Sequence, residues 1–212
     1  MKHNLSMTFF EDSISYYNAA IILSSCEQRN VDDQLFLTPI LYLYRHSAEL
    51  VIKAIILSYL ERFSTENSIK DFFLYSEDGE KNKLQLMNCH SLNSLYSCLK
   101  YFDKTERIVS MFDDNELDFI DRVIKEIELI DKNSDYFRYP IGKNKEQHKR
   151  KFLAVSETDI MPDLSKVYQN FIYEGPNDKV IAFTSIEQEY IELSENIRIM
   201  TNILIRKYKK DD

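Results

Sequence analysis

Residues that interrupt helices are scarce in this chain, which has 3 Gly and 4 Pro among 212 residues. They can all be placed near predicted helix ends or in loops, and so few breakers favour long helices. The length is sufficient for one domain with a sizeable core. The sequence therefore predicts a mainly α fold in a single domain over residues 1–212.

Cysteine is also rare, and Cys26, Cys89 and Cys98 do not have the spacing of a metal site. We expect reduced thiols without a disulfide, as is usual in a cytosolic protein. Residues 1–8 lack the basic and then apolar layout of a signal peptide. Residues 36–60 are the best candidate for a membrane span, but ionisable residues interrupt them, which is costly in a bilayer. The expected location is the cytoplasm, with no membrane association.

Positive charge is not in excess, since the formal net charge is −8. This balance argues against broad attraction to nucleic acid, so any such contact must depend on a local patch. The best candidate is the basic run at residues 143–151, which contains Lys149 and Arg150. Charge runs are usually solvated surface, and no aromatic residue for base stacking occurs there before Phe152. The chain also lacks a Gly-rich phosphate loop and a nucleophile elbow, which argues against nucleotide hydrolysis and serine-type hydrolysis.

Apolar residues at helical spacing predict a series of helices joined by loops. The predicted helices cover about residues 10–28, 33–63, 92–102, 114–133 and 164–172, and a last helix begins at Thr184. Residues 64–89 form a predicted insertion between helices, either a loop or a hairpin at Asp78 and Gly79; residues 135–160 are loop-rich, and residues 179–183 form a short strand. We expect Asp113 or Asp114 to cap one helix, and Thr184 with Glu187 to cap the last. Four of these helices are long enough for an up-and-down bundle with loop insertions.

The second helix carries four ionisable residues in an otherwise apolar sequence, and we call Arg45, His46, Glu49 and Lys53 the polar island. With Arg45 at zero, Glu49 lies at roughly 40°, Lys53 at roughly 80° and His46 at roughly 100° around the helix. Apolar residues occupy the same sector above and below, so these groups must be paired or hydrogen-bonded. Because Glu49 has a cation one turn away on each side, the island is either an internal structural lock or a site with a tuned histidine.

Two residues outside this helix are candidates for the same polar centre. His90 stands at the start of a short helix, where a ring bonded to a neighbour is the more common role. With His46 and Glu49 it could hold zinc in principle, but no HExxH motif or cysteine pair supports a metal. Arg138 lies in a stiff extended segment before proline, next to Tyr139, and can meet either Glu49 or a phosphate group.

The segments Tyr44 to Lys53, His90 to Leu92 and Phe137 to Pro140 together resemble the HEPN-like helical proteins of prokaryotes. This resemblance implies an all-α bundle, often dimeric. Some members are metal-independent ribonucleases of toxin–antitoxin and phage-defence systems, and others bind nucleotides, RNA or a protein partner without catalysis. Catalytic members have an Arg followed by a His after four to six intervening residues. Here Arg45 and His46 are adjacent, and nine residues separate Arg138 from His148, so the catalytic pair cannot be carried over.

Two functions follow as hypotheses. The first is a non-catalytic or divergent HEPN-like module that self-assembles, or binds a partner or RNA, in a prokaryotic defence or toxin–antitoxin context. The alternative is a metal-independent RNA endonuclease with a rearranged site. The candidate catalytic residues are His46, Arg45, Glu49 and Arg138, and the candidate binding residues are Lys53, His90, Tyr139, Lys149 and Arg150. No cofactor or metal is expected, and a homo-oligomer is the expected assembly.

Overall fold

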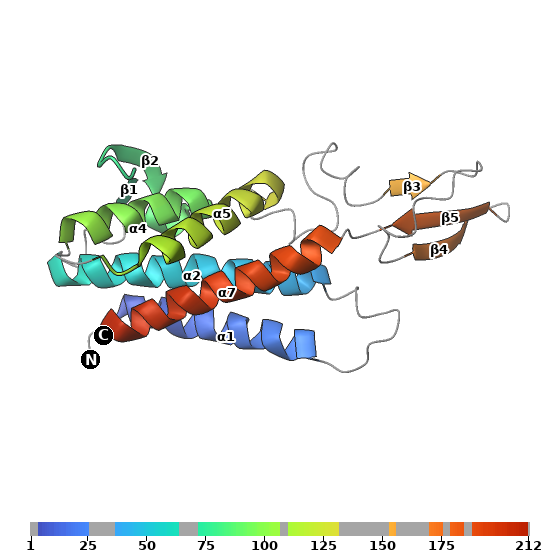
Figure 1. Ribbon diagram of the computed structural model, residues 1–212, viewed down its shortest axis with the longest axis horizontal. Coiled ribbons are helices and arrows are strands. Elements are labelled where there is room, and N and C mark those ends of the chain that lie inside the picture. The colour runs from blue at the N-terminus through green and yellow to red at the C-terminus, as the bar shows by residue number, and fades with distance from the viewer. Residues whose placement is uncertain are drawn as a thin grey trace.

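A computed structural model describes residues 4–25, 37–63, 72–106, 110–131, 153–155, 170–175, 179–184 and 188–211. The helices are α1 (Leu5–Ser25), α2 (Leu37–Phe63), α4 (Leu92–Glu106), α5 (Asp114–Asp131) and α7 (Gln188–Asp211). A 3-10 turn, η2 (Leu86–Asn88), precedes α4, and the strands are β1 (Phe73–Tyr75), β2 (Lys81–Gln85), β3 (Leu153–Val155), β4 (Asn170–Gly175) and β5 (Lys179–Thr184). The prediction of a mainly α bundle with a small hairpin is confirmed (Figure 1).

Helix α2 is the centre of the bundle. It contacts α1, α4 and α7, and in Figure 1 it runs through the middle, with α1 on one side and α4 and α5 on the other. Residues 47–60 are all buried, as expected for a helix that other elements cover on every side. Pro39 lies in the first turn, where its missing N–H costs no helical hydrogen bond.

Helix α1 begins earlier than the sequence pattern predicts. Asn4 caps it, because Asn4 Oδ1 accepts a hydrogen bond from Met7 N at 3.2 Å. The predicted start at Phe10 was therefore wrong, since the apolar stripe extends one more turn toward the N-terminus. Phe10 stacks on Tyr208 of α7 with ring centroids 4.2 Å apart, which ties the two ends of the described chain together.

Small hydroxyl side chains mark the contact between α1 and α2. Ser47 Oγ donates to the carbonyl oxygen of Ser13 at 2.7 Å, and the two hydroxyl oxygens lie 3.1 Å apart. Both residues are fully buried. The pair therefore satisfies its own polar atoms where the two helices approach closely.

The hairpin predicted at Asp78 and Gly79 is present. Strands β1 and β2 pair in antiparallel fashion, and Gly79 has a φ of 84° in the turn between them. Glycine adopts this left-handed backbone without the Cβ clash of other residues. The hairpin contacts α4, and the Tyr75 and Tyr101 rings stack at 5.0 Å.

Local caps set the starts of α4 and α5. Ser91 Oγ accepts from Ser94 N at 3.2 Å at the start of α4. Asp113 Oδ1 accepts from Glu116 N, and Glu116 Oε2 accepts from Asp113 N, which makes a reciprocal capping box at α5. Of the two caps predicted for α5, the structure uses Asp113.

A second sheet has the strand order β3-β5-β4, with both pairs antiparallel. The strand predicted at residues 179–183 is confirmed as β5. The helix predicted at residues 164–172 was wrong for residues 170–172, which belong to β4, while residues 164–169 lie outside the described part. Aromatic and β-branched residues on both sides of a Gly-Pro turn favour a hairpin here, and strand pairing overrides the helical spacing.

Helix α7 is described from Gln188. Thr184 is the final residue of β5, where it pairs with Leu153 and Asn170. The capping box predicted for Thr184 and Glu187 stays a prediction, because residues 185–187 lie outside the described part. The buried stripe predicted for this helix is present in α7 at Leu193, Ile197, Met200 and Leu204. Among the described residues, no helix is long and apolar enough to cross a membrane.

Candidate functional site

Three residues of the polar island form a chain of ion pairs along α2. Arg45 Nη1 lies 3.1 Å from Glu49 Oε2, and Lys53 Nζ lies 3.0 Å from Glu49 Oε1. Arg45, Glu49 and Lys53 are 0%, 1% and 3% exposed. Their spacing of four residues puts them on successive turns of one face, as the sequence predicts.

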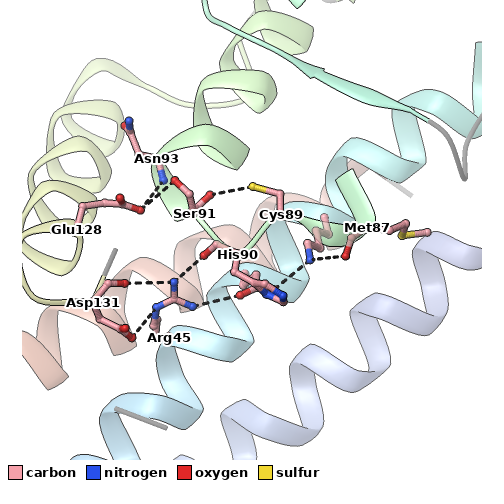
Figure 2. A network of polar contacts seen from close by, with 10 residues as sticks. Arg45, Met87, Cys89, His90, Ser91, Asn93, Glu128 and Asp131 are labelled. Carbon is pink, nitrogen blue, oxygen red and sulfur yellow. Dashed lines mark hydrogen bonds and ion pairs between the residues drawn. The ribbon is translucent and has the colours of Figure 1, made fainter. Parts of the chain in front are cut away.

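Asp131, the last residue of α5, is the second carboxylate of this cluster. Arg45 Nε lies 3.1 Å from Asp131 Oδ2, and Arg45 Nη2 lies 3.5 Å from the Asp131 carbonyl oxygen. Arg45 Nη2 also donates to the carbonyl oxygen of His90 at 2.6 Å (Figure 2). One guanidinium group thus joins α2 to the end of α5 and to the segment before α4. We call Arg45, Glu49, Lys53 and Asp131 the ion network.

Asp131 is not among the residues predicted from the sequence, although its position in the helix indicates that it is buried. It follows Ile127 by four residues on the buried stripe of α5, so its side chain faces inward with the apolar ones. An aspartate at the C-terminal end of a helix is unfavourable for the helix dipole. A buried acidic residue in such a position requires a cation, and Arg45 supplies it.

The ion network balances its own charge, with two cations and two carboxylates. Burial raises the pKa of Glu49, but the nearby charges of Lys53 and Arg45, with a smaller contribution from His90, lower it more. The net pKa of Glu49 therefore lies below its usual value. Glu49 is a carboxylate near neutral pH, and it accepts hydrogen bonds without donating any.

His90 closes the network toward the surface. Its Nδ1 lies 3.0 Å from Glu49 Oε1, the oxygen that also accepts from Lys53, and 45% of the His90 side chain is exposed. The next residue, Ser91, donates its hydroxyl to Glu128 Oε1 at 3.2 Å, and the same oxygen accepts from Asn93 N. Lys53 Nζ reaches the carbonyl oxygen of Met87 at 3.5 Å. Figure 2 shows these contacts around the segment that precedes α4.

His46 faces another part of the bundle. Its ring stacks on Tyr42 with centroids 5.5 Å apart, and it meets the Tyr16 ring of α1 edge to face at 4.5 Å. The side chain is half-buried. The structure therefore brings Arg45, Glu49 and Lys53 together with His90, and it places the His46 ring against aromatic rings on the α1 side.

The remaining candidate residues lie outside the described part of the chain. These are Arg138, Tyr139, Lys149 and Arg150. The expected meeting of Arg138 with Glu49 therefore stays a prediction. Within the described part, both oxygens of Glu49 already have cationic partners from α2 itself.

The other reactive side chains near the network are thiols. Cys89 and Cys98 are free and buried, and burial raises the pKa of both, to about 12 for Cys98. They are therefore poor nucleophiles. In the described residues, no group of three His, Cys, Asp or Glu side chains is arranged to hold a metal ion.

Comparison with known proteins gives no relative from which a role could be transferred. No family model, no curated protein and no solved structure matches the chain.

Proposed function

We propose that the chain is a HEPN-like helical module, divergent or non-catalytic toward RNA, that assembles with itself or with a protein or RNA partner, in a prokaryotic defence or toxin–antitoxin setting. The observation that carries the proposal is the complete burial of Arg45 between two carboxylates and two carbonyl oxygens. In this module the ion network is a structural lock between α2, α5 and the segment before α4.

The burial of Arg45 argues against the alternative, an RNA endonuclease that uses this arginine. A guanidinium group stabilises a phosphate only if it can touch it, and Arg45 has no exposed surface. Freeing Arg45 would break its buried ion pairs with Glu49 and Asp131, and breaking a buried ion pair costs about 3–5 kcal/mol. The formal net charge of −8 adds no long-range attraction for RNA.

Self-assembly is the part of the proposal that rests on the resemblance to HEPN-like bundles. Multi-angle light scattering after size exclusion tests it. We expect one stable oligomer over a wide range of protein concentration. A monomer at every concentration, with no partner retained on affinity purification from its host, would contradict the proposal.

The catalytic alternative has its own test. Purified protein is incubated with structured and single-stranded RNA in the presence of EDTA, beside the His46→Ala variant. We expect no cleavage by either protein. Cleavage that persists in EDTA and is lost in His46→Ala would replace the proposed module by the endonuclease.

A further inference from the structure

His90 differs from the four buried residues of the ion network because it combines a buried partner with an exposed ring. Its Nδ1 is fixed on the buried carboxylate of Glu49, whereas nearly half of its side chain is exposed. Within the described part of the chain, no residue makes a polar contact with its other ring nitrogen, Nε2. The ring is thus held from inside and open on its outer edge.

The chemistry of the partner decides which nitrogen of the neutral ring carries the proton. Glu49 is ionised, and a carboxylate only accepts hydrogen bonds, so His90 Nδ1 must be the donor. The neutral ring then has its lone pair on Nε2. Arg45 and Lys53 hold the Glu49 carboxylate in place from the other side, so the tautomer and the orientation of the ring are both set.

We propose that His90 is a nucleophilic, proton-accepting imidazole that acts on neutral carboxylic esters, with Glu49 as its positioning residue. A buried carboxylate that orients a histidine through Nδ1 leaves Nε2 ready to attack an electrophile or take a proton. This inference goes beyond the proposed function and does not depend on it, because an assembly module can carry such a group on its surface.

The surrounding charges indicate a neutral substrate. Among the described residues, the two cations that share the carboxylate of Glu49 with His90 are Lys53 and Arg45, and both are buried and paired with carboxylates. The charged group beside the next residue is Glu128, a carboxylate that would repel an anion. A phosphate ester would therefore find no exposed counter-charge among the described neighbours of His90.

The step balances as follows. The Nε2 lone pair attacks the acyl carbon, the bond from that carbon to the leaving oxygen breaks, and the alkoxide or phenolate departs with the electron pair. The ring becomes an acyl imidazolium, and its Nδ1–H stays hydrogen-bonded to Glu49. The negative charge of Glu49 stabilises the positive charge of the ring. Water then adds to the acyl carbon, and one of its protons passes through solvent to the departed alkoxide or phenolate. The bond between the acyl carbon and Nε2 breaks with its electron pair left on Nε2, and the carboxylic acid leaves.

The matched variant is His90→Asn. The asparagine amide can place an N–H where Nδ1 lies, so the contact with Glu49 is kept, but Nε2 is lost. The control is Cys89→Ser, which removes the adjacent buried thiol and leaves the ring and its partners unchanged. His90→Asn is expected to fold because the His90 side chain is half-exposed. Cys89→Ser is expected to fold because serine has nearly the shape of cysteine, and its hydroxyl can donate to the Ser91 carbonyl oxygen as the thiol does. Circular dichroism and the melting temperature check both variants.

The probe is p-nitrophenyl acetate, a neutral activated ester, with bis(p-nitrophenyl) phosphate as the anionic comparison. We expect wild type and Cys89→Ser to release nitrophenolate from the acetate at the same rate, and His90→Asn to lose that rate. The difference must exceed the rate with an equal concentration of N-acetyl-histidine amide. Equal rates in wild type and His90→Asn, a difference no larger than the free amide gives, or turnover of the phosphate that needs His90 would overturn the proposal.

A second measurement tests the positioning role of Glu49. The ¹⁵N chemical shifts of the His90 ring at alkaline pH, assigned by comparison with His90→Asn, report which nitrogen carries the proton. We expect a protonated Nδ1 and an unprotonated Nε2. The opposite tautomer, with the proton on Nε2, would overturn the proposal whatever the ester rate.

Discussion

Replacing Glu49 with glutamine is the most direct test of the ion network. The carboxylate accepts from Arg45 at 3.1 Å, from Lys53 at 3.0 Å and from His90 at 3.0 Å. Glutamine keeps the shape but removes the charge. Arg45 would keep its ion pair with Asp131, whereas Lys53 would have only neutral oxygens as partners within the described residues, such as the carbonyl oxygen of Met87 at 3.5 Å.

The expected cost follows from this stranded cation. Removing one partner of a buried ion pair costs about 3–5 kcal/mol, because the other charge is left uncompensated. An exposed pair is worth about 0.2–1 kcal/mol. Since Lys53 is 3% exposed, we expect Glu49→Gln to lower the free energy of unfolding by about 3–5 kcal/mol, as for a buried ion pair. The double variant with Lys53→Met removes the stranded charge, so the two changes should be coupled by about 1–3 kcal/mol.

The assay is urea denaturation followed by circular dichroism at neutral pH, on wild type, both single variants and the double variant. Lys104→Met is the surface control, because Lys104 is 62% exposed and pairs with Glu77. We expect this control to change the free energy of unfolding by less than about 1 kcal/mol. A cost for Glu49→Gln no larger than that of the control, or strict additivity with Lys53→Met, would show that Lys53 is not left uncompensated by the loss of the Glu49 charge.

Three further predictions concern pH and local geometry. Because the folded pKa of Glu49 is lowered, its stabilising effect is complete above the usual value of 4.5 and is lost as the pH falls through the folded pKa. Urea titrations at several pH values should thus show that the difference in free energy of unfolding between wild type and Glu49→Gln shrinks below a pH of about 4. A difference that stays constant with pH would contradict this expectation. Gly79→Ala should cost about 1–2 kcal/mol in the same assay, since φ is +84° and a Cβ would lie 3.1 Å from the Tyr101 ring. Asp113→Ala should lower the free energy of unfolding by about 1 kcal/mol, because Glu116 N loses its capping acceptor at the start of α5. An unchanged free energy of unfolding would show that this cap does not stabilise α5.

The ion pairs within α2 could be predicted from the sequence because they are local. Residues four apart on a helix are neighbours whatever surrounds them, so Glu49 had to lie between Arg45 and Lys53 once the helix was assigned. The contacts to Asp131 and to the His90 carbonyl oxygen depend on how α4 and α5 pack against α2. Spacing along one helix carries no information about that packing.

The wrong prediction of a helix at residues 164–172 has a physical cause. That helix rests on a short pattern that a strand satisfies equally well. The pairing of Phe171 with Phe183, and of Asn170 with Thr184, decides between them. Such pairing joins segments across a turn and is weakly encoded in either segment alone. The α5 cap was correct because a capping box is complete within four residues.

Residues that share one sector of α2 on a helical wheel do not necessarily form one site. Lys53 and His46 are separated by roughly 20° around α2 on an ideal wheel, yet their contacts lie on different neighbours. Lys53 pairs with Glu49 and reaches the carbonyl oxygen of Met87, whereas the His46 ring meets Tyr16 of α1. A buried central helix has several neighbours, and the boundary between two of them can fall between adjacent side chains. An Arg45 and His46 site would have to bridge that boundary, whereas Glu49 and His90 are already in contact on one side of it.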